Sequence, residues 1–81
     1  MQSKTLRPVL LKYLKKRKLE NKFTKQLRLL LTNYRHPSLH TEVLEPKHLK
    51  IYSFRIEKKY RVIFIIKDSI VEIIDINDHY Q

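Results

Sequence analysis

The C-terminal stretch YSFRIEKKYRVIFIIKDSIVEIIDINDHY, from Tyr52 to Tyr80, constrains the fold most strongly. Three runs rich in Ile, Val, Phe and Tyr are separated by the polar breaks EKK and KDS, a pattern typical of strand–turn–strand connections. We expect strands at about 51–56, 60–66 and 70–76, joined in antiparallel hairpins. The chain has no glycine, which primed two-residue turns favour, so we expect turns longer than two residues.

Two arginines interrupt the first two of these apolar runs, and His79 and Tyr80 close the third. We expect a three-residue loop at 57–59, which would place Arg55 opposite Arg61 with both guanidiniums on the face of the sheet turned away from the helices. A one-residue change of register would separate them. Charged groups in apolar strands are costly unless they line an edge or a site. The alternative is that the arginines pair with Glu57, Glu72 or Asp75 across strands and that His79 and Tyr80 form a frayed terminus.

The N-terminal part of the chain has helical periodicity. Pro8 suits the first turn of a helix, and Leu10, Tyr13 and Leu14 follow at spacings that place them on one stripe. We expect helices at about 8–17 and 20–33, forming an antiparallel hairpin, with a loop from Tyr34 to Lys50. The sequence therefore predicts one α+β domain over residues 1–81, a helical hairpin packed on a three- to four-stranded antiparallel sheet. Lys4–Leu6 is the candidate for a short edge strand.

The positive charge is confined to the N-terminal segment. Residues 1–35 hold eleven Lys or Arg and one acidic residue, whereas residues 36–81 hold seven of each, so the net charge of +10 belongs to the first segment. A field of this asymmetry indicates a polyanionic partner such as nucleic acid or an acidic protein segment, against the alternative of a solvated basic surface. The candidate RNA-binding residues are Lys12, Lys15, Lys16, Arg17, Lys18, Lys22, Lys25, Lys58 and Lys59.

Several classes of site are disfavoured. There is no cysteine for disulfides or thiolate ligands, and no apolar run long enough for a membrane span, so we expect a cytoplasmic protein without membrane contact. His36 and His40 have the i, i+4 spacing of helical zinc ligands, but Pro37 between them argues against a helix. His48 follows in the same loop, and a third ligand is not evident. We expect no metal and no cofactor.

Arg55, Arg61, His79 and Tyr80 form the leading candidate site. Cleavage of a phosphodiester without a metal needs a base for the 2′-hydroxyl, cations for the developing charge and an acid for the leaving oxygen. Arginine suits phosphate because its fork is planar and bidentate. We expect removal of Arg61 or His79 to lower cleavage by orders of magnitude. Stability should change little, because both side chains are expected at the surface.

Three segments of the chain are informative together: HPSLHTEVLE, YSFRIEKKYRVIF and the terminal VEIIDINDHY. They carry a resemblance to the RelE/ParE superfamily of bacterial type II toxins that covers nearly all of the chain. The terminal His-Tyr after the last strand is similar to YoeB-type members, which lack a C-terminal helix. The resemblance implies a ribosome-dependent endoribonuclease that cuts mRNA in the A site and is neutralised by a small antitoxin, acidic or partly disordered.

The resemblance also implies roles for particular residues. Arg61 matches the arginine that stabilises the scissile phosphate, and Arg55 a basic strand position on the same face. His79 matches a general acid or cation, Tyr80 a residue that orients substrate, and Glu42 the general base, with Glu45 as its rival.

One departure concerns the position at which RelE has a lysine, which is Ser53 here. The resemblance therefore does not imply a lysine-based mechanism for this chain. ParE-like relatives of the same fold inhibit DNA gyrase without nuclease activity, and that is the alternative function. A third alternative is a degenerate toxin that only binds its antitoxin.

Overall fold

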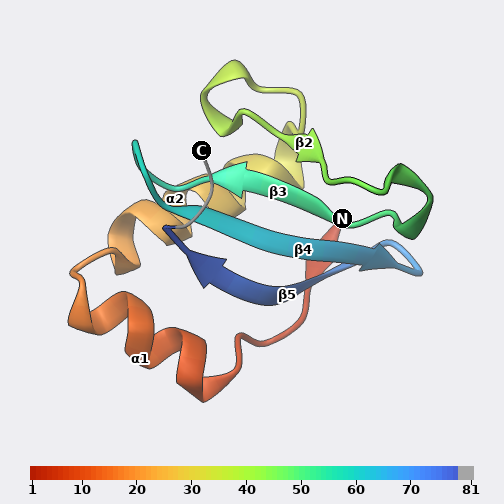
Figure 1. The fold of residues 1–81 in the computed structure, drawn as a ribbon. Coiled ribbons are helices and arrows are strands. Elements are labelled where there is room, and N and C mark those ends of the chain that lie inside the picture. The colour runs from red at the N-terminus through yellow and green to blue at the C-terminus, as the bar shows by residue number, and fades with distance from the viewer. Residues whose placement is uncertain (79–81) are drawn as a thin grey trace.

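Two helices and a five-stranded sheet make up the fold (Figure 1). The computed structural model describes residues 1–78. Helix α1 spans Pro8–Lys16 and α2 spans Glu20–Thr32, close to the ranges expected from periodicity. Figure 1 shows α2 passing behind the central strands and α1 alongside the C-terminal strand. The expected α+β class, a helical pair on a small sheet, is confirmed.

The three strands expected from the C-terminal pattern form the centre of the sheet. They are β3 (Tyr52–Arg55), β4 (Arg61–Lys67) and β5 (Ile70–Asn77), paired antiparallel in sequence order. A short strand β2 (Glu42–Val43) pairs antiparallel with β3, and β1 (Gln2–Ser3) pairs parallel with β5. The strand order is β1-β5-β4-β3-β2.

The sheet is thus larger than the three to four strands expected, and it is mixed rather than wholly antiparallel. Both added strands are two residues long, too short for an alternating pattern to be visible in the sequence. The N-terminal edge strand lies at Gln2–Ser3 and not at Lys4–Leu6.

The two hairpin turns differ. The β3–β4 connection has the expected three-residue loop, with Arg55 paired to Arg61 and a hydrogen bond of 3.0 Å from Ile56 N to Tyr60 O. The β4–β5 connection is a two-residue turn at Asp68 and Ser69, whose φ angles are 53° and 63°. The expectation of longer turns is wrong there, because these two non-glycine residues adopt the left-handed conformation that primed turns require.

The core lies between the helices and one face of the sheet. Phe54 and Phe64 are 0% and 1% exposed, with ring centroids 5.6 Å apart. The other buried apolar side chains come from both helices, the loops and the central strands: Leu10, Leu14, Leu19, Phe23, Leu30, Leu39, Ile56, Val62, Val71, Ile73 and Ile76. The opposite face of the sheet is not covered by either helix, and we call it the open face. Within residues 1–78, no helix is long and apolar enough to cross a membrane.

Candidate functional site

The strand register gathers five charged or polar side chains on the open face. Arg55 lies opposite Arg61, and Ser53, two residues before Arg55 on β3, projects to the same face. Glu42 on β2 pairs with Ser53, and Asn77 on β5 pairs with Arg61. The predicted sharing of one face by Arg55 and Arg61 is therefore correct, and Glu42 joins them from the edge strand.

Arg61 is held by the protein on this face. Its Nε and Nη2 donate hydrogen bonds of 3.2 and 2.7 Å to Ser53 Oγ, and Nη2 also donates to the carbonyl oxygen of His40 at 2.6 Å. Ser53 is 0% exposed and Arg61 only 4% exposed. The expectation that Arg61 lies at the surface is wrong, because the loop through His40 and the Ser53 hydroxyl bury its guanidinium. Charge-assisted bonds of this kind fix both its position and its plane.

The electrostatic surroundings of Arg61 are mixed. Burial lowers the pKa of Arg61, the Glu42 carboxylate opposes that shift, and the neighbouring Arg55 adds to it. The guanidinium still carries its charge at neutral pH, since arginine is not deprotonated in proteins. The face therefore presents two guanidiniums beside one carboxylate, the kind of set that can bind a phosphate and move a proton.

The structure distinguishes the two candidate carboxylates. Glu42 is in β2, opposite Ser53, and its charge acts on Arg61. Glu45 lies beyond the end of that strand, in an exposed segment before Pro46. The position of Glu42 makes it the better placed of the two to act together with Arg61.

The predicted basic residues are distributed over two parts of the surface. All of them are exposed. Lys22 and Lys25 of α2 line a hollow that Arg55 also lines, whereas the guanidinium of Arg17 covers the ring of Tyr13 on α1, 3.6 Å from its centroid. Only the α2 pair is thus shown to lie beside an open-face arginine. The others of this set are Lys12, Lys15, Lys16, Lys18, Lys58 and Lys59.

Tyr13 is part of a small polar-aromatic cluster between α1 and the β3–β4 turn. Its ring meets that of Tyr60 edge-on at a centroid distance of 6.4 Å. Burial raises the pKa of Tyr13, Arg17 opposes the shift, and Asp78 adds to it. This cluster joins the first helix to the hairpin that carries Arg61.

The histidines of the loop between α2 and β3, all within the described residues, do not form a metal site. His36 accepts a hydrogen bond from Ser38 N at Nδ1, 3.2 Å, and so begins the short 3₁₀ helix η1 (Pro37–Leu39), while His48 lies in a second one, η2 (Lys47–Leu49). In the part of the chain that the structure describes, no three His, Cys, Asp or Glu side chains are grouped to hold a metal ion. His79 and Tyr80 lie outside the described residues.

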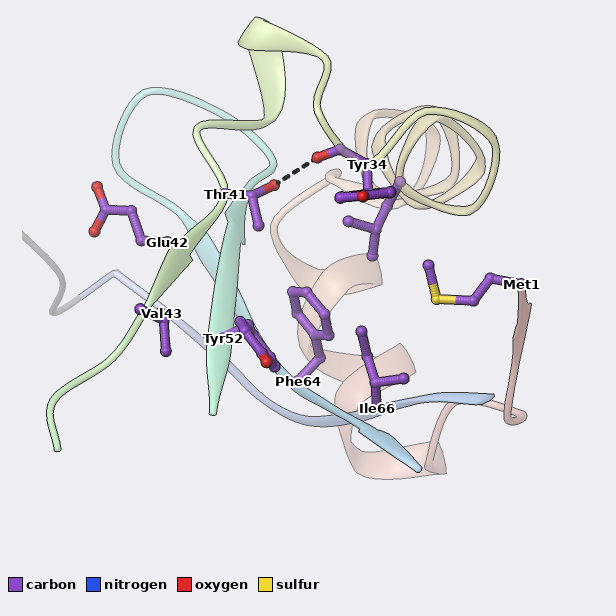
Figure 2. Close-up of a pocket in the computed structure, with 9 residues that line it drawn as sticks. Met1, Tyr34, Thr41, Glu42, Val43, Tyr52, Phe64 and Ile66 are labelled. Atoms are coloured by element: carbon purple, nitrogen blue, oxygen red, sulfur yellow. Dashed lines mark hydrogen bonds between the residues drawn. The ribbon is translucent and has the colours of Figure 1, made fainter. Parts of the chain in front are cut away.

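A separate apolar cavity of about 380 Å³ opens at the C-terminal end of α2. Figure 2 shows Met1, Tyr34, Phe64 and Ile66 around it, with Thr41 Oγ1 hydrogen-bonded to the carbonyl oxygen of Tyr34 at 3.3 Å. Met1, Tyr34 and Ile66 are 46%, 52% and 44% exposed. Exposed apolar surface of this kind is typical of a protein-binding region. In Figure 2 the Glu42 carboxylate is directed away from the cavity.

Sequence reasoning missed the two groups that hold Arg61. In the sequence Ser53 stands out only as the position of a missing lysine, and the carbonyl oxygen of His40 gives no signal at all. The alternation along β3 does contain one clue: once Arg55 and Arg61 are paired, Ser53 must be on their face.

Among solved structures, this chain is similar to a crystal structure of the heterotetrameric YoeB–YefM toxin–antitoxin complex from Staphylococcus aureus and to a second YoeB–YefM complex from that organism. Each match has a TM-score of 0.69 and 21% sequence identity, and covers 98% of this chain and 94% of the matched chain. The similarity confirms the RelE/YoeB-like fold expected from the resemblance. No family model matches the chain, and no curated protein sequence matches it significantly.

Proposed function

We propose that this chain is the toxin of a bacterial type II toxin–antitoxin pair and acts as a metal-independent, ribosome-dependent endoribonuclease that cuts mRNA in the A site. The observation that carries the proposal is the fixed guanidinium of Arg61, which lies opposite Arg55 on the open face and feels the charge of the Glu42 carboxylate. The fold shared with YoeB–YefM complexes supports a toxin with an antitoxin partner. Those matches do not favour the ParE-like gyrase inhibitor.

In the proposed reaction, Glu42 takes the proton of the 2′-hydroxyl, whose oxygen attacks the adjacent phosphorus. Arg61 and Arg55 stabilise the charge that develops on the phosphoryl oxygens. The 5′-oxygen leaves with a proton from a general acid, the role proposed for His79, and Tyr80 orients the substrate. The products are a 2′,3′-cyclic phosphate and a 5′-hydroxyl.

The burial of Arg61 has a catalytic consequence. A guanidinium that is 4% exposed and already hydrogen-bonded does not need to reorganise when negative charge develops near it. Its field is also less screened by solvent than that of an exposed arginine. We therefore assign to Arg61 the fixed positive charge at the phosphate that is cut, and to the more exposed Arg55 a contact with the RNA backbone beside it.

The basic residues of α1 and α2 are proposed to bind ribosomal RNA. An acidic antitoxin segment fits the same charge, and the apolar cavity at Met1, Tyr34 and Ile66 suits a protein partner. Cytoplasmic action follows from a ribosomal target.

The test compares two matched carboxylates. Purified E42Q and E45Q are incubated with ribosomes programmed with mRNA, and cleavage is followed by primer extension. We expect E42Q to be slower by about 10²- to 10⁴-fold, the usual contribution of a general base, and E45Q to cut like the wild type. If E42Q cleaves normally, or if induction blocks DNA synthesis before protein synthesis in pulse-labelled cells, the proposal is wrong.

A further inference from the structure

A basic cleft lies next to the open-face site, between α2 and the end of β3. Its volume is about 320 Å³, and we call it the Arg55 cleft. It is lined by Lys22, Lys25, Gln26, Ser38, Arg55, Ile56 and Glu57. Arg55 is thus shared: it faces Arg61 across the β3–β4 pair and also borders this cleft.

Gln26 gives the cleft a fixed frame. It is 7% exposed, and its Nε2 donates to the carbonyl oxygens of Ser38 at 3.2 Å and Arg55 at 2.9 Å. One buried amide therefore joins α2, η1 and β3. Because buried amides with satisfied hydrogen bonds are rigid, the backbone of Arg55 is held in place before any ligand arrives.

Arg55 lacks the internal partners that Arg61 has. Its Nε is buried without a hydrogen-bond partner, and no carboxylate within residues 1–78 forms an ion pair with it. An unsatisfied buried donor costs about 1–3 kcal/mol. Arg55 also faces Arg61 directly across the strands, and like charges in that relation are destabilising. An anion bound beside Arg55 relieves the second cost, because its negative charge offsets the repulsion between the two guanidiniums.

The remaining charges of the cleft favour an anion. Lys22, Lys25 and Arg55 contribute three positive charges, and Glu57 contributes one negative charge. Glu57 Oε2 lies 2.9 Å from Lys22 Nζ, in a pair whose side chains are 37% and 57% exposed. Exposed pairs of this kind are weak, so Lys22 can exchange Glu57 for a stronger acceptor.

We propose that the Arg55 cleft binds a phosphodiester phosphate of the single RNA strand, adjoining the phosphate that is cut beside Arg61. The inference rests on the proposed function, because it takes the cleaved strand as the ligand. Arg55 contributes a planar pair of donors and the lysines contribute charge. The cleft thereby sets the direction in which the strand leaves the open face, over the end of β3 towards α2.

The first experiment titrates ¹⁵N-labelled wild-type protein with inorganic phosphate and follows the arginine Nε–H resonances by NMR. Disappearance of one resonance in R55K assigns Arg55. We expect a saturable shift of the Arg55 resonance, with an apparent Kd about 2- to 5-fold weaker in K25A, the loss of one exposed ion pair. The matched control K67A removes an exposed lysine of β4 outside the cleft and should retain the wild-type Kd.

The second titration uses a 2′-O-methyl RNA trinucleotide, which lacks the 2′-hydroxyl needed for cleavage. We expect it to shift the Arg55 resonance at lower concentration than inorganic phosphate does. If Arg55 does not shift, or if all arginine resonances shift in proportion without saturation, the cleft is not a site. If inorganic phosphate alone shifts it, the cleft is an adventitious anion site and the RNA assignment is wrong.

Neither titration depends on cleavage, so the two proposals fail separately. A saturable Arg55 shift together with normal cleavage by E42Q keeps the cleft and removes the proposed mechanism. Loss of cleavage in E42Q together with an unmoved Arg55 resonance keeps the mechanism and removes the cleft.

Discussion

The hydrogen bonds between Ser53 and Arg61 make a prediction that can be tested on stability alone. Ser53 Oγ accepts two bonds from a guanidinium that is almost fully buried. The substitution Ser53→Ala removes the acceptor and leaves the charge in place. Arg61 Nε then loses its hydrogen bond to Ser53. Arg61 Nη2 loses one of its two acceptors but keeps its bond to the carbonyl oxygen of His40.

The expected cost follows from these contacts. A hydrogen bond to a charged group contributes about 1.5–3 kcal/mol, so we expect S53A to lower the free energy of unfolding by about 2–3 kcal/mol. Small domains have about 5–15 kcal/mol in total. The corresponding fall in Tm is about 8–24 °C for a domain of this size. Substitutions at an exposed serine such as Ser38 should stay within about 0.5 kcal/mol.

A double-mutant cycle assigns the effect to Arg61. Urea unfolding at pH 7, followed by circular dichroism, gives the free energies of wild type, S53A, R61M and S53A/R61M. In the R61M background the hydroxyl has no guanidinium to bind, so we expect S53A to cost less than about 0.5 kcal/mol there. If S53A costs the same in both backgrounds, or costs little in either, Ser53 does not hold Arg61 and the structural basis of the proposed site is wrong.

Two further predictions concern neighbouring contacts. The substitution Gln26→Leu keeps the volume but removes the donor to the carbonyl oxygens of Ser38 and Arg55, so we expect about 1–3 kcal/mol of destabilisation in the same urea assay. An unchanged unfolding midpoint would show that Gln26 does not hold these two segments together. Burial raises the pKa of Tyr13, so the folded state keeps its phenol proton to higher pH than the unfolded state does. The contribution of the Tyr13 phenol to the free energy of unfolding is therefore complete below pH 10, the ordinary pKa of tyrosine, and is lost as pH rises through the pKa of the folded state. We expect the Tm of Y13F to fall less than that of the wild type when melting curves are recorded at alkaline pH.

Much of the fold could be predicted from the sequence because its signals are local. The two helices follow from apolar spacing after Pro8, and the three central strands from apolar runs between EKK and KDS. Even the pairing of Arg55 with Arg61 follows from one loop length, since a three-residue loop fixes the register. The turn at Asp68 and Ser69 was missed because its positive φ angles are forced by the strands on either side rather than by glycine.

The sequence predicted which residues belong to the candidate site, but not the contacts that hold them. The sequence by itself determined the helices, the central strands, the position of the charge and which arginines share a face, because these depend on period, spacing and composition. Only the tertiary structure decided that Arg61 is buried, that Ser53 and the carbonyl oxygen of His40 hold it, and that Gln26 leaves Arg55 beside a cleft. The physical reason is sequence separation: His40 and Arg61 are 21 residues apart, and Gln26 and Arg55 are 29 apart, so no local pattern records that they meet.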